Sequence, residues 1–217
     1  MKKREYSTIC KQITCHLREF VPKKDMLIMV PMGHVLRGIC FENAGLEARQ
    51  FYMWAFLMPL YIPSDYISLN FGKRLGGGSH TWNADNPRLI DNTMNTIRRE
   101  ALPFLGSPSY DDNAISQYIL KLASRHLNQH DREIEAYTLI RTGEYEASLT
   151  AIDNLLLNLD KEVEWEQKMW ERVLLIKTKL LTNPTYALEQ MSIWRERTID
   201  SLRVSSYHDT FRSNRGY

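Results

Sequence analysis

Residues 50–82 read QFYMWAFLMPLYIPSDYISLNFGKRLGGGSHTW, and this stretch decides the fold. Residues 51–60 are apolar on both alternations of an extended chain, which indicates a central strand that is covered on both faces. Pro59 and Pro63 close that strand, because a proline nitrogen cannot donate to a sheet ladder. Residues 66–71 then alternate between apolar and polar side chains, which predicts a further strand with one face in the core.

Upstream of this stretch the sequence predicts a helix and two more strands. Residues 5–20 place apolar side chains at the i, i+3, i+4 and i+7 positions of a helix, and Pro22 follows them as a stop signal. Residues 26–30 and 35–41 are short runs rich in β-forming residues, each followed by a turn signal. Connections this short leave no room for crossover helices. We therefore expect an antiparallel meander of about four strands, with the helix packed on one face.

The glycine-rich segment that follows the last strand, residues 72–86, breaks the regular pattern. Three consecutive glycines, residues 76–78, cannot hold a regular element without a large loss of conformational entropy. The segment also carries the candidate binding surface of this chain, which consists of Lys73, Arg74, His80 and Trp82. The structural alternative is a flexible connection between sheet and helices. A phosphate-binding loop is not indicated, because the G-x-x-x-x-G-K-[ST] spacing is missing.

Everything after the glycine segment is helical in pattern. Asn86-Pro87, Asp111 and Asp131 are N-terminal helix signals, and Gly143 is a C-terminal one. The expected helices cover residues 87–102, 113–127, 131–141, 145–159, 163–181 and 184–202. The sequence thus predicts an α+β protein with a helix-plus-sheet domain (residues 1–82), an all-helical domain (83–204) and a polar, frayed tail (205–217).

Two segments of the helical half repeat a helix, tight turn and helix about 40 residues apart. The first, EAYTLIRTGEYEASLTAIDNLL, resembles a tetratricopeptide hairpin at Ala136, Gly143, Tyr145 and Ala147, with Ala147 at the close crossing of its two helices. The second, RVLLIKTKLLTNPTYALEQMSIW, lacks the glycine. The resemblance implies a right-handed stack with a groove that binds protein partners. Simple antiparallel helix packing is the alternative.

The segment PLYIPSDYISLNFGKRLG resembles one in a family of small uncharacterised bacterial proteins. That resemblance implies an N-terminal helix, an antiparallel sheet and a helical C-terminal half. It implies no activity.

Composition places limits on partners and compartment. The net charge is +2, with 14 Lys and Arg against 9 Asp and Glu in residues 1–105, and 14 against 17 in residues 106–217. No concentrated basic run is present, so nucleic acid is not the expected partner. The N-terminal residues lack the apolar segment of a secretory signal, and residues 51–62 are too short to span a bilayer. We expect a cytoplasmic protein whose three cysteines are reduced and buried.

No catalytic residue, metal site or cofactor is predicted. His126 and His130 have chelating spacing only if one continuous helix carries both, and no glutamate lies between them as in a zinc protease. His80 could act with Cys40 or Asp65 as a base and nucleophile, but no pattern brings them together. Tyr52, Trp54 and Phe56 form an aromatic strand face, which is expected to pack against the helical half rather than to bind single-stranded nucleic acid.

We therefore expect a cytosolic, non-enzymatic protein-interaction module, such as an adaptor or an immunity-type protein that binds and masks a protein partner. The alternative is an enzyme of unknown reaction with a site in the cleft between the sheet and helical halves. The partner, the biological process and the oligomeric state follow from no pattern in the sequence.

Overall fold

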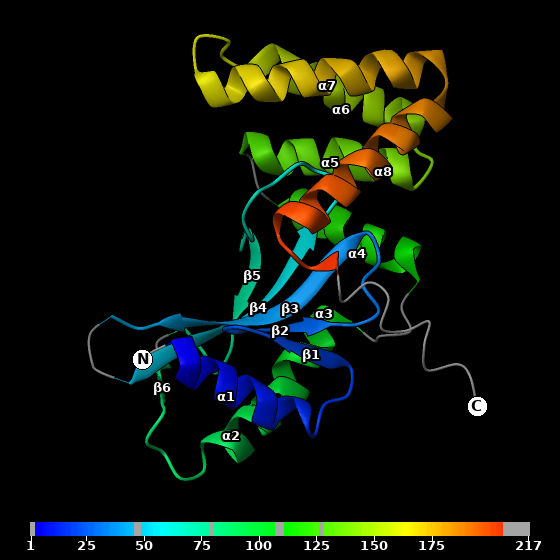
Figure 1. Cartoon of the computed structure of the whole chain (residues 1–217). Coiled ribbons are helices and arrows are strands. Elements are labelled where there is room, and N and C mark those ends of the chain that lie inside the picture. The colour runs from blue at the N-terminus through cyan, green and yellow to red at the C-terminus, as the bar shows by residue number, and fades with distance from the viewer. Residues whose placement is uncertain (1–2, 46–48, 79, 107–110, 126–127, 206–217) are drawn as a thin grey trace, which may run out of the picture. The chain divides into compact units, whose positions relative to one another are not determined.

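The computed structural model (Figure 1) describes residues 3–45, 49–78, 80–106, 111–125 and 128–205. It confirms the α+β class, with an N-terminal helix, an antiparallel sheet and then a series of helices. The contacts divide the chain into two compact units. The first unit comprises Met1–Met58, Tyr66–Tyr110 and Leu202–Tyr217, and the second comprises Pro59–Asp65 and Asp111–Ser201.

The sheet belongs to the first unit and has six strands, compared with the predicted number of about four. Its strands are β1 (Phe20–Lys23), β2 (Met26–Met29), β3 (Val35–Asn43), β4 (Gln50–Pro59), β5 (Phe71–Arg74) and β6 (Trp82–Asn83). Their order in space is β1-β2-β3-β4-β5, and β6 also pairs with β4. The order follows the sequence, as predicted for a meander. β4 is covered on both faces only from Ala55 onward, since Tyr52 and Trp54 are half-buried.

The predicted strand at residues 66–71 is wrong. The ladder with β4 begins only at Phe71, opposite Leu57, and continues to Arg74. The residues before it form local turns, in which the Gly72 N–H donates to the Leu69 carbonyl at 2.8 Å. The reason is that residues 59–65 belong to the second unit, so the connection from β4 to β5 is an excursion rather than a tight hairpin.

The first helix, α1 (Lys3–Thr14), is shorter than the predicted residues 5–20. Phe20 opens β1 instead, and Pro22 lies inside that strand opposite Leu27. An edge strand tolerates proline, because one side of its backbone has no ladder partner. Tyr6 of α1 packs against the sheet, with its ring 5.9 Å from that of Phe51.

The helix predicted at residues 87–102 also belongs to the first unit. It consists of α2 (Leu89–Thr96), a π-helical turn η1 (Ile97–Ala101) and α3 (Leu102–Leu105). Pro103 therefore lies inside the helical stretch rather than beyond it. The predicted cap at Asn86 is displaced, because its side chain accepts from the Arg88 N–H at 2.9 Å and α2 begins one residue later.

The second unit contains five helices within the described residues. They are α4 (Asp112–Ala123), α5 (Gln129–Arg141), α6 (Tyr145–Asn158), α7 (Glu164–Thr182) and α8 (Pro184–Ser201). Asp111 caps α4 as predicted, through a 2.7 Å bond from the Ala114 N–H. The cap of α5 is Asn128 rather than Asp131, whose own N–H donates to the Asn128 side chain at 2.9 Å. Gly143 ends α5 in the predicted left-handed conformation, with φ of 83°.

The close crossing of α5 and α6 lies one residue from the predicted position. Ala136 is fully buried, and its carbonyl accepts a 2.8 Å hydrogen bond from the hydroxyl of Ser148. Ala147, which the tetratricopeptide resemblance places at the crossing, is exposed. A small residue is needed where two helix backbones approach, and Ser148 meets that requirement while satisfying a carbonyl of α5.

The second unit also holds the segment of residues 59–65, which leaves the end of β4 and forms turns and bends. Tyr61 is fully buried and its hydroxyl lies 2.7 Å from that of Thr138 on α5. Thr198 of α8 accepts a hydrogen bond from the Ser64 N–H and donates one to the Ile62 carbonyl, both at 3.3 Å. The predicted domain boundary after residue 82 marks the change from strands to helices. The compact units are divided at other positions, because the chain passes from one unit to the other after Met58, Asp65, Tyr110 and Ser201.

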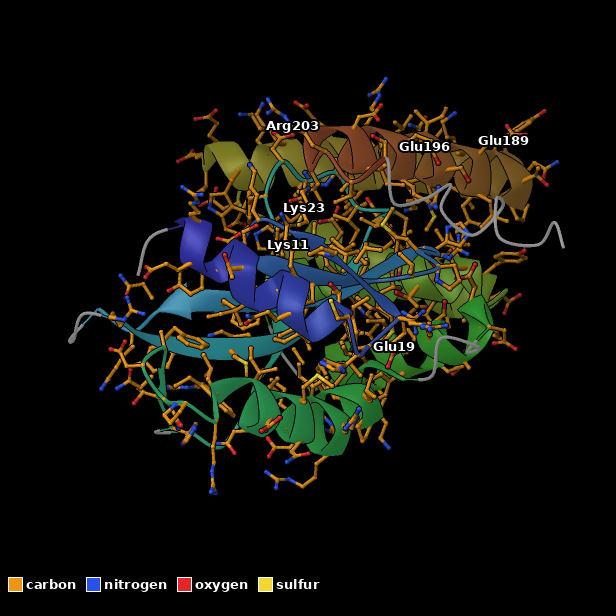
Figure 2. All side chains as sticks on the ribbon, turned by 60° about the horizontal axis from the view of Figure 1, so that its bottom comes forward. Lys11, Glu19, Lys23, Glu189, Glu196 and Arg203 are labelled. Carbon is orange, nitrogen blue, oxygen red and sulfur yellow. The ribbon has the colours of Figure 1, made fainter. Side chains whose placement is uncertain are left out.

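The chain returns to the first unit after α8. The ammonium of Lys23 donates to the Leu202 carbonyl. Burial lowers the pKa of Lys23, and the positive charges of Lys24 and Arg203 lower it further. Lys23 and Arg203 are labelled in Figure 2. The predicted tail at residues 205–217 falls, after Ser205, outside the described residues.

Candidate functional site

The glycine loop interrupts one edge of the sheet. Arg74 of β5 pairs with Trp54, and Trp82 of β6 pairs with Phe51, so β5 and β6 follow the same edge of β4. Between these two ladders β4 has two residues, 52 and 53, whereas seven residues of sequence, 75–81, separate β5 from β6. An edge strand with extra residues bulges out of the sheet and redirects its side chains, a device common beside binding sites. The predicted break is therefore a long bulge, and Lys73 and Arg74 belong to the strand before it.

A carboxylate from the π-helical turn holds the start of this loop. Gly76 has a φ of 84°, and its N–H donates to Glu100 at 2.9 Å. Glu100 also pairs with the adjacent Arg99 at 2.7 Å. The hydrogen bond from Arg99 lowers the pKa of Glu100, and the Gly76 N–H and the charge of Lys73 act in the same direction.

Arg74 is turned back onto the sheet. Its guanidinium lies 3.6 Å from the centre of the Tyr52 ring, which is a cation–π contact. It also donates to the His80 carbonyl at 3.1 Å. Lys73 pairs with Ala55 and therefore points to the opposite face of the sheet, where it is exposed. Arg74 thus organises the loop, whereas Lys73 is open to a partner.

His80 and Trp82 are in contact at the end of the loop. Their rings meet edge to face, with centroids 4.7 Å apart. His80 is exposed, but Trp82 is buried, with 6% of its surface exposed. The structure therefore brings Arg74, His80 and Trp82 together, and leaves Lys73 and His80 as the exposed part of the predicted surface. The buried Trp82 ring is the surface on which His80 packs.

The three cysteines differ in environment. Burial raises the pKa of Cys10 and of Cys40 to about 12. A thiol in that state is not an activated nucleophile. Cys10 is buried as expected, whereas Cys40 is half-buried and Cys15 is exposed, so the expectation that all three are buried is wrong for Cys15 and only partly met by Cys40. Cys15 lies just beyond the shortened α1, where the predicted helix would have continued.

No group of three or more His, Cys, Asp or Glu side chains placed to hold a metal occurs among the described residues. His130 stacks on Trp165 with ring centroids 5.1 Å apart. His126, which has chelating spacing to His130 only on one continuous helix, lies outside the described residues.

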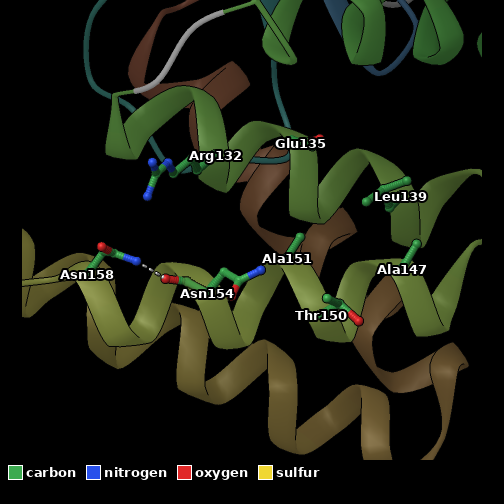
Figure 3. Close-up of a pocket in the computed structure, with 8 residues that line it drawn as sticks. All are labelled: Arg132, Glu135, Leu139, Ala147, Thr150, Ala151, Asn154 and Asn158. Atoms are coloured by element: carbon green, nitrogen blue, oxygen red, sulfur yellow. Dashed lines mark hydrogen bonds between the residues drawn. The ribbon is translucent and has the colours of Figure 1, made fainter.

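A second candidate site, which the sequence analysis missed, is a groove in the second unit (Figure 3). It has a volume of about 670 Å³ and lies between α5 and α6. The residues that line it are Arg132, Glu135, Leu139, Ala147, Thr150, Ala151, Asn154 and Asn158. We call it the α5–α6 groove. The signal in the sequence was a stripe of small and amide residues at helical spacing on α6, which an apolar-stripe search passes over.

Comparison of the chain with protein-family models, curated proteins and solved structures found no match. Within the described parts of the chain, none of the helices combines the length and the apolar content needed to cross a bilayer.

Proposed function

We propose that this protein is a protein-interaction module that holds a segment of its partner in the α5–α6 groove. The observation that carries the proposal is the groove itself. Its volume of about 670 Å³ suits a short peptide, and its lining combines short side chains with amides and one charge of each sign. Arrays of helical hairpins commonly use surfaces between their helices in this way.

The lining of the groove is well suited to the main chain of a peptide. Asparagine amides offer both a donor and an acceptor, which match the acceptor and donor of a peptide unit. The small side chains Ala147, Thr150 and Ala151 leave room for a chain to approach α6. The second unit already holds the backbone of one connecting segment through a polar side chain, since the Thr198 hydroxyl bonds to the backbone of both Ile62 and Ser64.

A tryptophan placed in the groove tests the proposal. Thr150 lines the groove, and its hydroxyl bonds only locally, to the Glu146 carbonyl at 3.1 Å. Thr178 of α7 has the same local bond, to the Leu174 carbonyl at 2.9 Å, but does not line the groove. The tagged full-length chain and the variants Thr150→Trp and Thr178→Trp would be purified from native lysate, and stoichiometric partners quantified.

We expect a stoichiometric partner with the wild type and with Thr178→Trp, and its loss with Thr150→Trp at unchanged thermal stability. Retention of the same partner by Thr150→Trp would reject the groove as the binding site. The absence of any stoichiometric partner for the wild type would reject the function.

A further inference from the structure

The two ends of the α5–α6 groove have opposite chemical character, and this inference rests on the function proposed above. At one end Arg132 extends from α5 toward the part of α6 that carries Asn154 and Asn158 (Figure 3). Arg132 is half-buried, and its guanidinium makes no hydrogen bond or ion pair with any described residue. The Asn158 amide donates to the Asn154 carbonyl at 2.6 Å. The side-chain amide of Asn154 bonds to none of the described residues.

The other end of the groove is apolar. Leu139 of α5 lies there with Ala147 and Ala151 of α6. Leu139 follows Arg132 by seven residues, which is about 10 Å along an α-helix. An extended peptide covers that distance with about three residues.

We propose that the groove binds a peptide segment that has a carboxylate at one end and an apolar side chain about three residues away. The carboxylate pairs with the fork of Arg132 and accepts from the amide of Asn154, and the apolar side chain packs on Leu139, Ala147 and Ala151. Arginine is suited to this role, because its planar guanidinium matches the two oxygens of a carboxylate.

The charge of the groove selects a single carboxylate over other anions. Glu135 lines the groove between Arg132 and Leu139, so the lining carries one positive and one negative charge. A nucleic acid or a doubly charged phosphate would meet Glu135 without a second cation to offset it. For the same reason the middle of the bound segment carries no acidic residue. The carboxylate comes from an acidic side chain or from a chain terminus, and the chemistry of both is the same.

Four synthetic peptides test the proposal on the full-length chain. The first is N-acetyl Leu-Ser-Ser-Gly with a free C-terminal carboxylate, and the second is the same peptide as a C-terminal amide. The third is an amide with glutamate in place of glycine, and the fourth has a free carboxylate with serine in place of leucine. Binding is followed by the NMR signals of the Asn154 and Asn158 side-chain amides during titration.

We expect the first and third peptides to shift these signals, and the second and fourth to bind about tenfold more weakly or not at all. Binding of the first peptide alone assigns the site to a chain terminus, and binding of the third alone assigns it to an acidic side chain. Arg132→Gln should weaken binding about tenfold. Arg197→Gln removes the same charge at an exposed position of α8 outside the groove and should leave binding unchanged.

Equal affinity for the acid and amide peptides, unchanged affinity in Arg132→Gln, or no binding of any peptide would overturn the inference. The function stands separately. If the peptides fail but Thr150→Trp still loses the native partner, the groove binds proteins by another chemistry. If Thr150→Trp also keeps the partner, both proposals fail.

Discussion

The backbone N–H of Gly76 donates a 2.9 Å hydrogen bond to the carboxylate of Glu100. Glu100 lies in the π-helical turn η1, and Gly76 is the second residue of the bulge that separates β5 from β6. π-helical turns inside α-helices often occur at functional positions, because the extra residue redirects nearby side chains. Here the turn supplies an acceptor to a loop whose backbone leaves the sheet ladder.

Removal of this carboxylate should loosen the glycine loop. We expect Glu100→Ala to cost about 1 kcal/mol of stability, since the Gly76 N–H loses a charged acceptor, and Glu100→Gln to cost less because an acceptor oxygen remains. Amide hydrogen exchange at Gly76 should accelerate in the order wild type, Gln variant, Ala variant. Asp91→Ala, at an exposed acidic position of α2, is the matched control. Unchanged exchange at Gly76 in Glu100→Ala would contradict the role assigned to the bond.

The same contact should depend on pH. The pKa of Glu100 is lowered from 4.5, first by the hydrogen bond from Arg99 and then by the Gly76 N–H. The folded protein therefore favours the ionised carboxylate, and this stabilisation is present above 4.5 and is lost as the pH falls through the folded pKa. When the free energy of unfolding is measured between neutral pH and pH ~3, the Glu100→Gln variant should lack the decrease that protonation of Glu100 causes in the wild type.

The two left-handed glycines of the loop offer an internal comparison. Gly76 and Gly77 have φ of 84° and 94°, so alanine at either site should cost about 1–2 kcal/mol in backbone strain. A Cβ at Gly76 would also lie 2.7 Å from Cδ2 of His80, whereas one at Gly77 meets nothing within 4 Å. We expect denaturant unfolding to show a lower free energy of unfolding for both variants than for the wild type. Only Gly76→Ala should also shift the NMR signals of the His80 and Trp82 rings, and equal shifts in both variants would contradict this packing.

The glycine loop also shows what sequence patterns can and cannot predict. The glycine triplet correctly marks the departure from regular structure, because glycine preference is a local property of the backbone. The register is not local. Residues 66–71 alternate like a strand but do not pair with β4, since residues 59–65 are held in the other unit. Likewise Leu17 and Phe20 have helical spacing and are buried, yet Leu17 lies in the connection after α1 and Phe20 begins β1.

For a buried ion pair in the second unit we predict a larger effect on stability. Glu133 of α5 is fully buried and accepts two hydrogen bonds from Arg172 of α7, one of them at 2.8 Å. Glu133→Gln should cost about 3 kcal/mol, because it leaves the partly buried guanidinium without a counter-charge. The double variant Glu133→Leu with Arg172→Met should recover most of that loss. Glu164→Ala, which breaks the exposed pair with Lys168, is the control and should not measurably change the unfolding midpoint.

Equal losses in the single and double variants would show that packing rather than charge dominates at this position. The comparison also bears on the site. Glu133 and Arg132 are neighbours in sequence, but one faces the core and the other the groove. Nothing in the local pattern separates them, because the partner of the buried charge, Arg172, comes from α7, 39 residues further along the chain.

The last prediction concerns the segment that the sheet domain contributes to the helical unit. Burial raises the pKa of Tyr61 to about 12, and the side chain is fully buried, with its hydroxyl 2.7 Å from that of Thr138. We expect Tyr61→Phe to cost about 1 kcal/mol for the lost hydrogen bond, and Tyr61→Ala about 3–5 kcal/mol for the cavity. Tyr186→Phe, at a side chain that is 47% exposed, is the control for the hydroxyl. The stability of all three variants is measured by chemical denaturation, followed by the helical signal in far-ultraviolet circular dichroism. If Tyr61→Ala left the helical transition unchanged, the segment would not be part of the helical core, and a fragment of residues 83–204 would be expected to fold as stably without it.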